Sequence, residues 1–249
     1  MRAGSATIMR VIDNMKVEIY ELLEGARKAW GTVVIIDVFR AFTMESYAFG
    51  SGARRIYPVG DIEQAYRRKR EDANLLLAGE RGGVKQPGFD FGNSPFEVQK
   101  ADLRGKTLVH TTSAGTQGVA AAIARADELL LGALVNARAT AQYIRAKNPR
   151  QVSLVAMGLA GVTPTEEDLL CAQYLKALLE GRPFDTRGAA ERLQAGDGAR
   201  FFRAESQDSA PQEDFWLSLA FDRFSFALPV RRDENGDIYT EPVSVQLPL

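Results

Sequence analysis

A glycine-rich loop at residues 79–95 carries the side chains of this sequence best suited to bind a charged ligand. It holds two carboxylates, Glu80 and Asp90, and an arginine, Arg81. Carboxylate oxygens are the ligands that Mg²⁺ prefers, and the planar guanidinium group of arginine matches phosphate. Glycine lets the backbone approach a ligand closely. The loop therefore predicts a site that holds a metal ion and an anion together.

Similar side chains follow other apolar runs of the chain. Asp37 and Arg40 come after the run at 33–36, and Asp168 lies beyond the run at 151–157. Ligands of parallel α/β sheets bind outside the carboxyl ends of the strands. We therefore expect these side chains to converge with those of the glycine-rich loop.

A hydroxyl-rich turn after another apolar run is a second candidate anion site. Its residues are Thr112, Ser113, Ala114, Gly115 and Thr116. The backbone amides of such a strand-to-helix turn can bind a phosphate group. The turn lacks the lysine-containing pattern of a P-loop, which argues against a nucleoside triphosphatase. The alternative is an ordinary capped turn without a ligand.

Several candidates also have a purely structural interpretation. Asp37 could cap the helix that follows it, or it could act as a metal ligand or as a nucleophile that accepts a phosphoryl group. Either Asn93 or Ser94 could cap a helix that begins at Pro95. His110, the only histidine, lies inside an apolar run and is expected to be a hydrogen-bonded core residue. A zinc site built on several histidines is excluded.

The apolar pattern indicates which elements must position these residues. Apolar, β-rich runs occur at 33–38, 54–59, 74–78, 106–112, 128–133 and 151–157. Helical patterns lie between them at 41–49, 62–71, 117–126 and 136–147. Continuous rather than alternating apolar runs are typical of strands that are covered on both faces. The pattern predicts a three-layer α/β/α fold around a mainly parallel or mixed sheet.

A further long helix is predicted at 165–180. Thr163 is its expected N-cap, Glu166 completes a capping box, and Gly181 ends it. Glu166, together with the acids that follow it, also complements the positive end of the helix dipole.

The C-terminal third has a different character. Residues 186–225 look helical and more polar than the rest. A turn at 234–237, followed by a strand-like segment at 238–247, predicts a hairpin.

Length and composition are those of an ordinary globular protein. With 249 residues, 45% of them hydrophobic, we expect a single domain over 1–249, or two lobes at about 1–104 and 105–249. A net charge of −1 gives no field that would attract nucleic acid. No apolar run approaches the roughly 20 residues that span a membrane, and the polar start at 1–7 does not read as a signal peptide. The single cysteine, Cys171, is expected in the core and favours a cytoplasmic protein.

Five segments occur in an order and at spacings that are informative together. They are V-I-I-D-V-F-R-A at 34–41, G-E-R at 79–81, G-F-D-F-G-N-S-P at 88–95, T-T-S-A-G-T at 111–116 and E-D-L-L-C-A at 167–172. Over roughly residues 30–180 the chain resembles the 2-phosphosulfolactate phosphatase (ComB) family. The resemblance implies a family-specific α/β/α fold and a magnesium-dependent phosphatase. Such an enzyme hydrolyses 2-phospho-3-sulfolactate to sulfolactate and phosphate, a step toward coenzyme M.

On this interpretation each candidate residue has an expected role. The expected magnesium ligands are Asp37, Glu80, Asp90 and Asp168. Arg40 and Arg81 are expected to act with three of these acids, Asp37, Glu80 and Asp90, in catalysis. The expected substrate-binding residues are Asn93, Ser94, Thr112, Ser113, Gly115 and Thr116. Either water attacks the phosphorus directly or an aspartyl-phosphate forms on Asp37.

Two positions depart from the family pattern. Ala114 stands where asparagine is expected, and residues 41–44 read A-F-T-M where the family is threonine-rich. Both changes remove polar groups near the expected site, so the substrate could be another small anionic phosphate ester. The alternative function is non-catalytic binding of a phosphorylated or sulfonated metabolite. No membrane or nucleic-acid partner is expected, and a homodimer is left open.

Overall fold

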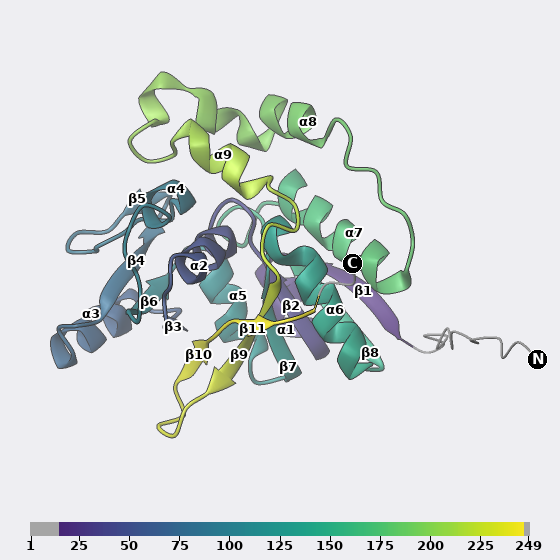
Figure 1. Cartoon of the computed structure of the whole chain (residues 1–249), viewed down its shortest axis with the longest axis horizontal. Coiled ribbons are helices and arrows are strands. Elements are labelled where there is room, and N and C mark those ends of the chain that lie inside the picture. Colours follow the sequence, from purple (N-terminus) through teal and green to yellow (C-terminus); the bar gives the residue numbers. More distant parts are fainter. Residues whose placement is uncertain (1–14, 247–249) are drawn as a thin grey trace, which may run out of the picture.

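The strands of the chain join in a mixed sheet, which runs through the centre of the molecule in Figure 1. The computed structural model describes residues 15–246, so the polar start at 1–7 and the last residue of the segment at 238–247 lie outside it. The strands are β1 (Lys16–Glu21), β2 (Gly31–Ile36), β3 (Arg55–Pro58), β4 (Leu76–Arg81), β5 (Val84–Lys85), β6 (Thr107–Thr111), β7 (Ala126–Gly132), β8 (Gln151–Ala156), β9 (Phe226–Arg232), β10 (Ile238–Thr240) and β11 (Val243–Ser244).

All six predicted apolar runs form strands, namely β2, β3, β4, β6, β7 and β8. Four of the six residues of β2 are valine or isoleucine, whose branched side chains suit a pleated surface. Strand β1 was not predicted from the sequence; in the described sheet it pairs only with β8. Strand β1 lies at the edge of the sheet and is only partly covered. Its residues therefore range from buried to exposed and form no continuous apolar run.

The sheet consists of two parallel groups joined by an antiparallel hairpin. Strands β1, β8, β2 and β7 form one group, and β3, β6 and β4 form the other. The predicted C-terminal hairpin is confirmed as β9 and β10, which pair with β7 and β3 respectively. Each group contains strands from both predicted lobes, since β6 joins β3 and β4 while β1 and β2 join β7 and β8.

Helices cover both faces of the sheet, which confirms the predicted three-layer arrangement. The helices are α1 (Leu22–Lys28), α2 (Ala41–Gly50), α3 (Ile62–Glu71), α4 (Pro95–Val98), α5 (Gly115–Ala122), α6 (Ala137–Lys147), α7 (Glu166–Glu180), α8 (Ala189–Ala195) and α9 (Gln212–Ser218), with short 3₁₀ turns η1 (Leu134–Asn136), η2 (Asp197–Phe202) and η3 (Ala204–Ser206). Val33 and Ile35 of β2 pack with α1, α2 and α5, whereas Val34 and Ile36 pack with α6 and α7. None of the helices in residues 15–246 combines the length and the apolar character that a membrane span requires.

The predicted start of α7 is wrong. Thr163 does not cap this helix, because its backbone pairs with Leu159 in a tight loop: the Leu159 amide donates to the Thr163 carbonyl at 2.8 Å. The helix begins instead at Glu166 and has no side-chain cap. Its end is as predicted, with Gly181 in the left-handed conformation. Helix α5 is also shorter than predicted, since β7 already begins at Ala126.

The segment predicted to be helical at 186–225 forms several short helices rather than one long one. Residues 189–218, which we call the cover segment, contain α8, η2, η3 and α9. In Figure 1 this green segment arches above α7 and α2 at the top of the molecule. Phe201 and Phe215 anchor it in the core on the α7 side of the sheet. The cover segment thereby reaches the ends of strands that lie far from it in the sequence.

Gly79 is a position where the backbone leaves no room for a side chain. Its φ is +134°, and a Cβ atom there would lie 1.9 Å from the carbonyl oxygen of Thr111 on the adjacent strand β6. We predict that Gly79→Ala lowers the free energy of unfolding by roughly 3 kcal/mol or more, through backbone strain and overpacking. Urea unfolding measures this loss.

The matched control is Gly236→Ala in the β9–β10 turn. Gly236 also has a positive φ, +82°, but nothing lies within 4 Å of the added Cβ atom. This variant should lose only about 1 kcal/mol, the cost of the left-handed conformation alone. Equal losses in the two variants would contradict the steric explanation.

Candidate active site

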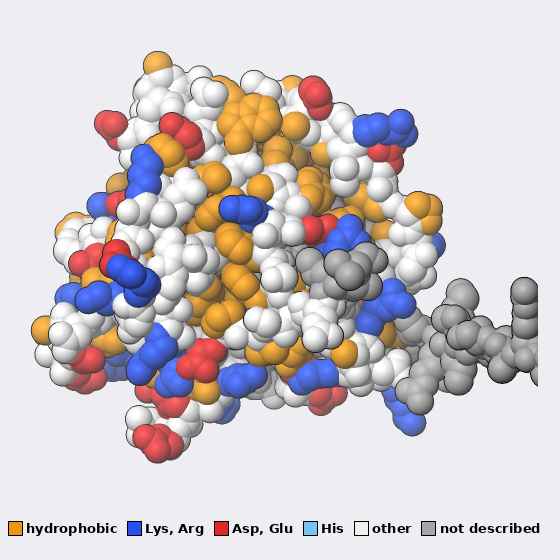
Figure 2. All heavy atoms as spheres, viewed as in Figure 1, with side chains coloured by type: hydrophobic (Ala, Val, Ile, Leu, Met, Phe, Trp, Pro, Cys, Tyr) orange, Lys and Arg blue, Asp and Glu red, His pale blue; other side chains and the backbone are white. Residues whose placement is uncertain are grey.

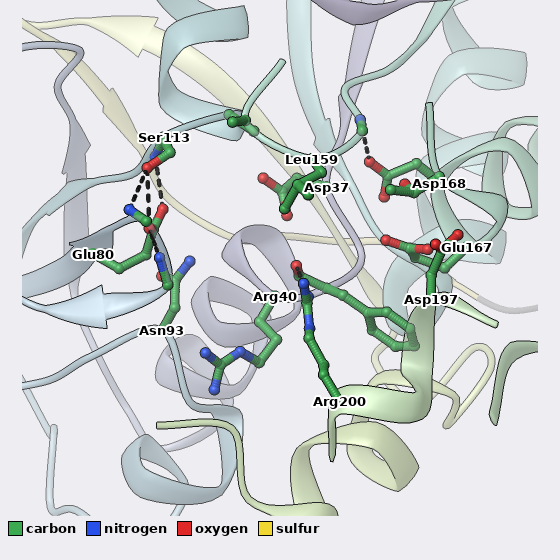
Figure 3. Close-up of a pocket in the computed structure, with 17 residues that line it drawn as sticks. Asp37, Arg40, Glu80, Asn93, Ser113, Leu159, Glu167, Asp168, Asp197 and Arg200 are labelled. Carbon is green, nitrogen blue, oxygen red and sulfur yellow. Dashed lines mark hydrogen bonds between the residues drawn. The ribbon is translucent and has the colours of Figure 1, made fainter. Parts of the chain in front are cut away.

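A pocket of about 230 Å³ lies where the carboxyl ends of β2, β4, β6 and β8 meet the cover segment. Figure 3 shows polar side chains from several elements gathered around it. Six residues predicted from the sequence line it: Asp37, Arg40, Glu80, Asn93, Ser113 and Asp168. The structure therefore brings together side chains that are up to 131 positions apart in the chain (168 − 37).

Asp37 is held by backbone amides on both sides of its carboxylate. Its Oδ1 accepts a hydrogen bond from the Ala41 amide at 3.0 Å, and its Oδ2 accepts one from the Gly115 amide at 2.9 Å. A Cβ atom at Gly115 would lie only 2.9 Å from Oδ2, so glycine permits this close approach. Asp37 thus satisfies the first amide of α2 and also faces the pocket, and the two interpretations of this residue are compatible.

Asp168 is fixed in the same way. Its Oδ1 accepts from the Val38 amide at 2.7 Å, and its Oδ2 accepts from the Gly158 amide at 2.8 Å. The carboxylate at the start of α7 therefore ties the end of β2 to the loop after β8.

Glu80 lies on the opposite wall, next to the hydroxyl-rich turn. Its Oε1 accepts from the Ser113 amide at 2.7 Å, and its Oε2 accepts from the Gly83 amide at 2.6 Å and from the Ser113 hydroxyl at 3.0 Å. The amides of Ser113 and Gly115, predicted to face a phosphate, are thus already bonded to Glu80 and Asp37. The turn positions the acids of the pocket.

Thr112 and Thr116 close the turn on itself. The Thr112 amide donates to the Thr116 hydroxyl at 2.8 Å, and the Thr116 amide donates to the Thr112 hydroxyl at 3.1 Å. Both side chains are buried and neither lines the pocket. This closure accounts for the two threonines as structural residues of the turn.

Several buried carboxyl groups lie together on the wall of the pocket opposite Glu80. Burial raises the pKa of Asp37 and of Glu167, and burial together with the neighbouring charge of Glu167 raises the pKa of Asp168 well above its ordinary range. The Oε2 atom of Glu167 accepts no hydrogen bond within the described part of the chain. A cation placed among these acids would favour their ionised forms.

Arg40 forms a buried ion pair with the cover segment. Its Nη1 lies 2.6 Å from Oδ2 of Asp214, and both side chains are almost inaccessible to solvent. Asp214 also accepts from the Ser94 hydroxyl at 2.7 Å and from the Phe96 amide at 3.0 Å. The predicted anion-binding arginine therefore already has a carboxylate partner.

Ser94 has a structural role at the start of α4. Its hydroxyl oxygen accepts from the Glu97 amide at 3.1 Å and so caps α4, while the hydroxyl proton goes to Asp214. Ser94 does not line the pocket. Of the two residues left ambiguous by the sequence, Ser94 caps the helix and Asn93 faces the pocket.

Asp90 and Arg81 do not line the pocket. The chain folds back along β4 at this point, so the Asp90 carboxylate accepts from the Leu77 amide at 2.8 Å and lies 3.7 Å from the Lys69 ammonium group. The Arg81 guanidinium group donates to the carbonyl oxygens of Glu80 and Gly60. It also donates to the Thr111 hydroxyl at 2.8 Å. The glycine-rich loop thus contributes Glu80 and Asn93 to the site and uses the other two residues for its own structure.

His110 is a buried core residue, as predicted, and it orients a side chain of the pocket. Its Nδ1 lies 2.7 Å from Glu45 Oε1, and its Nε2 lies 2.8 Å from Asn93 Oδ1. Thr240 of the hairpin donates to the other oxygen of Glu45 at 3.3 Å. This buried chain of polar groups connects the C-terminal hairpin to Asn93 in the pocket.

The whole arrangement can be compared with known proteins. The family model for 2-phosphosulpholactate phosphatase matches residues 17–225. That match covers every element that lines the pocket.

The chain belongs to the 2-phosphosulpholactate phosphatase family.

Three relatives carry the name probable 2-phosphosulfolactate phosphatase. The protein of Carboxydothermus hydrogenoformans is 42% identical over 166 residues, which is 66% of this chain and 68% of that protein. The protein of Thermotoga petrophila is 37% identical over 192 residues, or 77% of this chain and 81% of that protein. The protein of Bacillus subtilis is 32% identical over 212 residues, or 83% and 89%.

The two departures from the 2-phosphosulpholactate phosphatase pattern lie in different environments. Ala114 lines the pocket, so its methyl group adds apolar surface beside Glu80 and Ser113. Residues 41–44 are fully buried at the start of α2, and Thr43 there bonds to the Val38 carbonyl at 2.8 Å. The change at 114 therefore affects the pocket surface, whereas the changes at 41–44 affect the packing behind it.

Four residues that form or support the site were not predicted from the sequence. Asp197 and Arg200 of η2 line the pocket, and Asp214 of α9 holds Arg40. All three lie in the polar cover segment, where no apolar run marks a strand end. Glu45 was missed because it lies within a helix whose other members are mostly apolar.

Removing one partner of the buried Arg40–Asp214 pair should be costly, because the other charge stays buried. We predict that Asp214→Ala lowers the free energy of unfolding by about 3 kcal/mol or more, since it leaves the Arg40 charge buried without its partner. Chemical denaturation measures the change.

An exposed pair provides the control. Asp102→Ala removes the partner of Arg104, and the side chains of this pair are 63% and 83% exposed. Its loss should stay below about 1 kcal/mol. If both variants lose the same small amount, the Arg40–Asp214 pair does not hold the cover segment in place.

Proposed function

We propose that this protein hydrolyses 2-phospho-3-sulfolactate to sulfolactate and phosphate, and that it requires Mg²⁺. Membership in the 2-phosphosulpholactate phosphatase family supports the substrate class. The observation that carries the proposal is the pocket itself, in which Asp37, Glu80 and Asp168 meet at the carboxyl ends of parallel strands. Within this proposal the enzyme works in the cytoplasm, on the route toward coenzyme M.

The acids of the pocket suit a magnesium ion that keeps part of its water shell. The described residues contain no group of three or more His, Cys, Asp or Glu side chains placed to bind a metal. Mg²⁺ needs only one or two carboxylates, because waters and the phosphate of the substrate complete its ligands. Asp37 and Asp168 are the acids that we expect to hold it, since both are buried and their charges need compensation. Once bound, the ion would neutralise phosphate oxygens and orient an attacking water.

Other residues of the chain would position the substrate and the acids. Oδ1 of Asn93 is bonded to His110, so the amide nitrogen of Asn93 remains to donate to a substrate oxygen. Glu80 lies on the opposite wall of the pocket from Asp168, where it bonds to Ser113 and Gly83, and we assign it to holding the loop against the turn. Asp90 is not part of the proposed metal site, because it lies outside the pocket.

We favour direct attack by water over an aspartyl-phosphate intermediate. Both oxygens of Asp37 accept backbone hydrogen bonds. Such bonds stabilise the charge of a carboxylate and lower its reactivity as a nucleophile.

The first test of the function is phosphate release. Incubation with 2-phospho-3-sulfolactate and Mg²⁺ should release inorganic phosphate, and excess EDTA should stop the release. Lack of metal-dependent release from this compound and from a panel of small anionic phosphate esters would overturn the proposal. Tight binding of a phosphorylated or sulfonated compound without turnover in any metal would support the alternative, a non-catalytic binder.

A pair of isosteric substitutions tests which acids act. Asp37→Asn should lower kcat/KM by about 100-fold or more, the scale typical for loss of one preorganised electrostatic group. Asp90→Asn should stay within a few-fold of the wild type, because Asp90 is engaged with Leu77 and Lys69 away from the pocket. Comparable losses in both variants would show that Asp90 reaches the reaction after all.

A further inference from the structure

The two arginines that line the pocket differ in their partners. Arg40 is paired with Asp214. Arg200 forms no ion pair with any carboxylate in residues 15–246, and its side chain donates a single hydrogen bond, from Nη2 to the Phe39 carbonyl at 3.1 Å. A guanidinium group has five N–H donors. Most of the hydrogen-bonding capacity of Arg200 is therefore unused, although the residue is only partly exposed.

The surroundings of Arg200 are unusual for a cation without a partner. Burial and the positive charge of Arg40 lower its pKa, while the charges of Glu167, Asp37 and Asp197 oppose this shift. A buried guanidinium group without compensating bonds is unfavourable. An anion held beside it would supply the missing charge-assisted hydrogen bonds.

The position of Arg200 indicates which anion it would meet. Its side chain reaches from η2 to the carbonyl of Phe39, which lies two positions after Asp37. The guanidinium group of Arg200 is therefore held at the strand end that carries Asp37. In Figure 3 Arg200 rises from the green ribbon toward Asp37, whereas the guanidinium group of Arg40 is turned aside. A metal ion held by Asp37 and Asp168 would bind phosphate oxygens, so the phosphoryl group would lie beside these acids.

We propose that Arg200 binds the phosphoryl group of the substrate and stabilises the charge that develops on it during hydrolysis. This inference rests on the proposed phosphatase function. It assigns to Arg200 the role that the sequence analysis gave to Arg40 and Arg81. Arginines in this role typically contribute large factors to the rate of phosphoryl transfer.

A purely structural role for Arg200 makes different predictions. Its guanidinium group lies 5.1 Å from the centroid of the Phe201 ring, which is within range of a cation–π contact. If this contact were its main function, substitution would change stability but not the affinity for phosphate. A lysine at this position would preserve the charge but lose the planar fork of donors.

The experiment measures the binding of both reaction products by calorimetry in the presence of Mg²⁺. We expect Arg200→Gln to lower the affinity for inorganic phosphate at least tenfold and to leave the affinity for sulfolactate unchanged. It should also lower kcat for 2-phospho-3-sulfolactate by about 100-fold or more. Arg200→Lys should recover part of both losses. The control is Arg203→Gln, an exposed arginine three positions along the cover segment, which should resemble the wild type.

Two outcomes would overturn the inference. Unchanged phosphate affinity in a folded Arg200→Gln protein would show that Arg200 does not contact the phosphoryl group. Loss of sulfolactate affinity with phosphate affinity retained would assign Arg200 to the second acidic group of the substrate. Thermal unfolding verifies that the variants are folded, and Arg200→Lys provides the same comparison if the glutamine variant is not.

The binding measurements separate this inference from the proposed function. If the wild type hydrolyses no phosphate ester, the proposed function fails and the rate role of Arg200 fails with it, whereas phosphate binding that depends on Arg200 would still support its contact with a phosphate group. If the wild type is active and Arg200→Gln keeps both full activity and phosphate affinity, only the inference fails.

Discussion

Three buried carboxylates need hydrogen-bond donors. This need determines how the loops around the pocket are arranged. Each of Asp37, Asp168 and Glu80 accepts backbone amides from two different places in the chain. A buried carboxylate without such partners would be strongly unfavourable, so these bonds fix the relative positions of the loops after β2, β4, β6 and β8. The pocket is thus the meeting point of loops that its own acids hold together. Figure 2, which shows the outer surface of the same view, has charged side chains of both signs scattered over it, in contrast to the concentration of acids inside.

A second buried interaction attaches the cover segment to this framework. Asp214 receives hydrogen bonds from Arg40, Ser94 and the Phe96 amide, and it therefore ties α9 to the end of β2 and to the start of α4. The aromatic rings of Phe201 and Phe215 hold the same segment from the core side. Arg200 and Asp197 can face the pocket only because these contacts fix η2. The charge balance of the site thus depends on a segment of short helices and 3₁₀ turns.

The sequence predicts the layers and the strand ends well, because a strand covered on both faces must be apolar along its whole length. Asp37 and Glu80 were found for the same reason, since each closely follows an apolar run, whereas Asp168 lies in the first turn of α7, further beyond the run that forms β8. Asp90 could not be placed, because the path of a glycine-rich loop depends on where it pairs, and here it turns back along β4. Arg200 and Asp214 gave no signal at all. Their position results from the tertiary course of the cover segment, which leaves no periodic pattern in the sequence.

The hairpin that joins the two parallel groups also has a consequence for how the chain folds. Strands β9 and β10 follow every strand of both groups in the sequence, yet they lie between β7 and β3 in the sheet. During synthesis, β7 cannot pair with β9 and β3 cannot pair with β10 until the hairpin residues have left the ribosome. Before that point the inner edges of β7 and β3 are open to pairing with other chains. Such late, long-range pairing slows folding and favours aggregation of intermediates. Factors that protect nascent chains are therefore expected to matter more for this protein than for one whose sheet grows in sequence order.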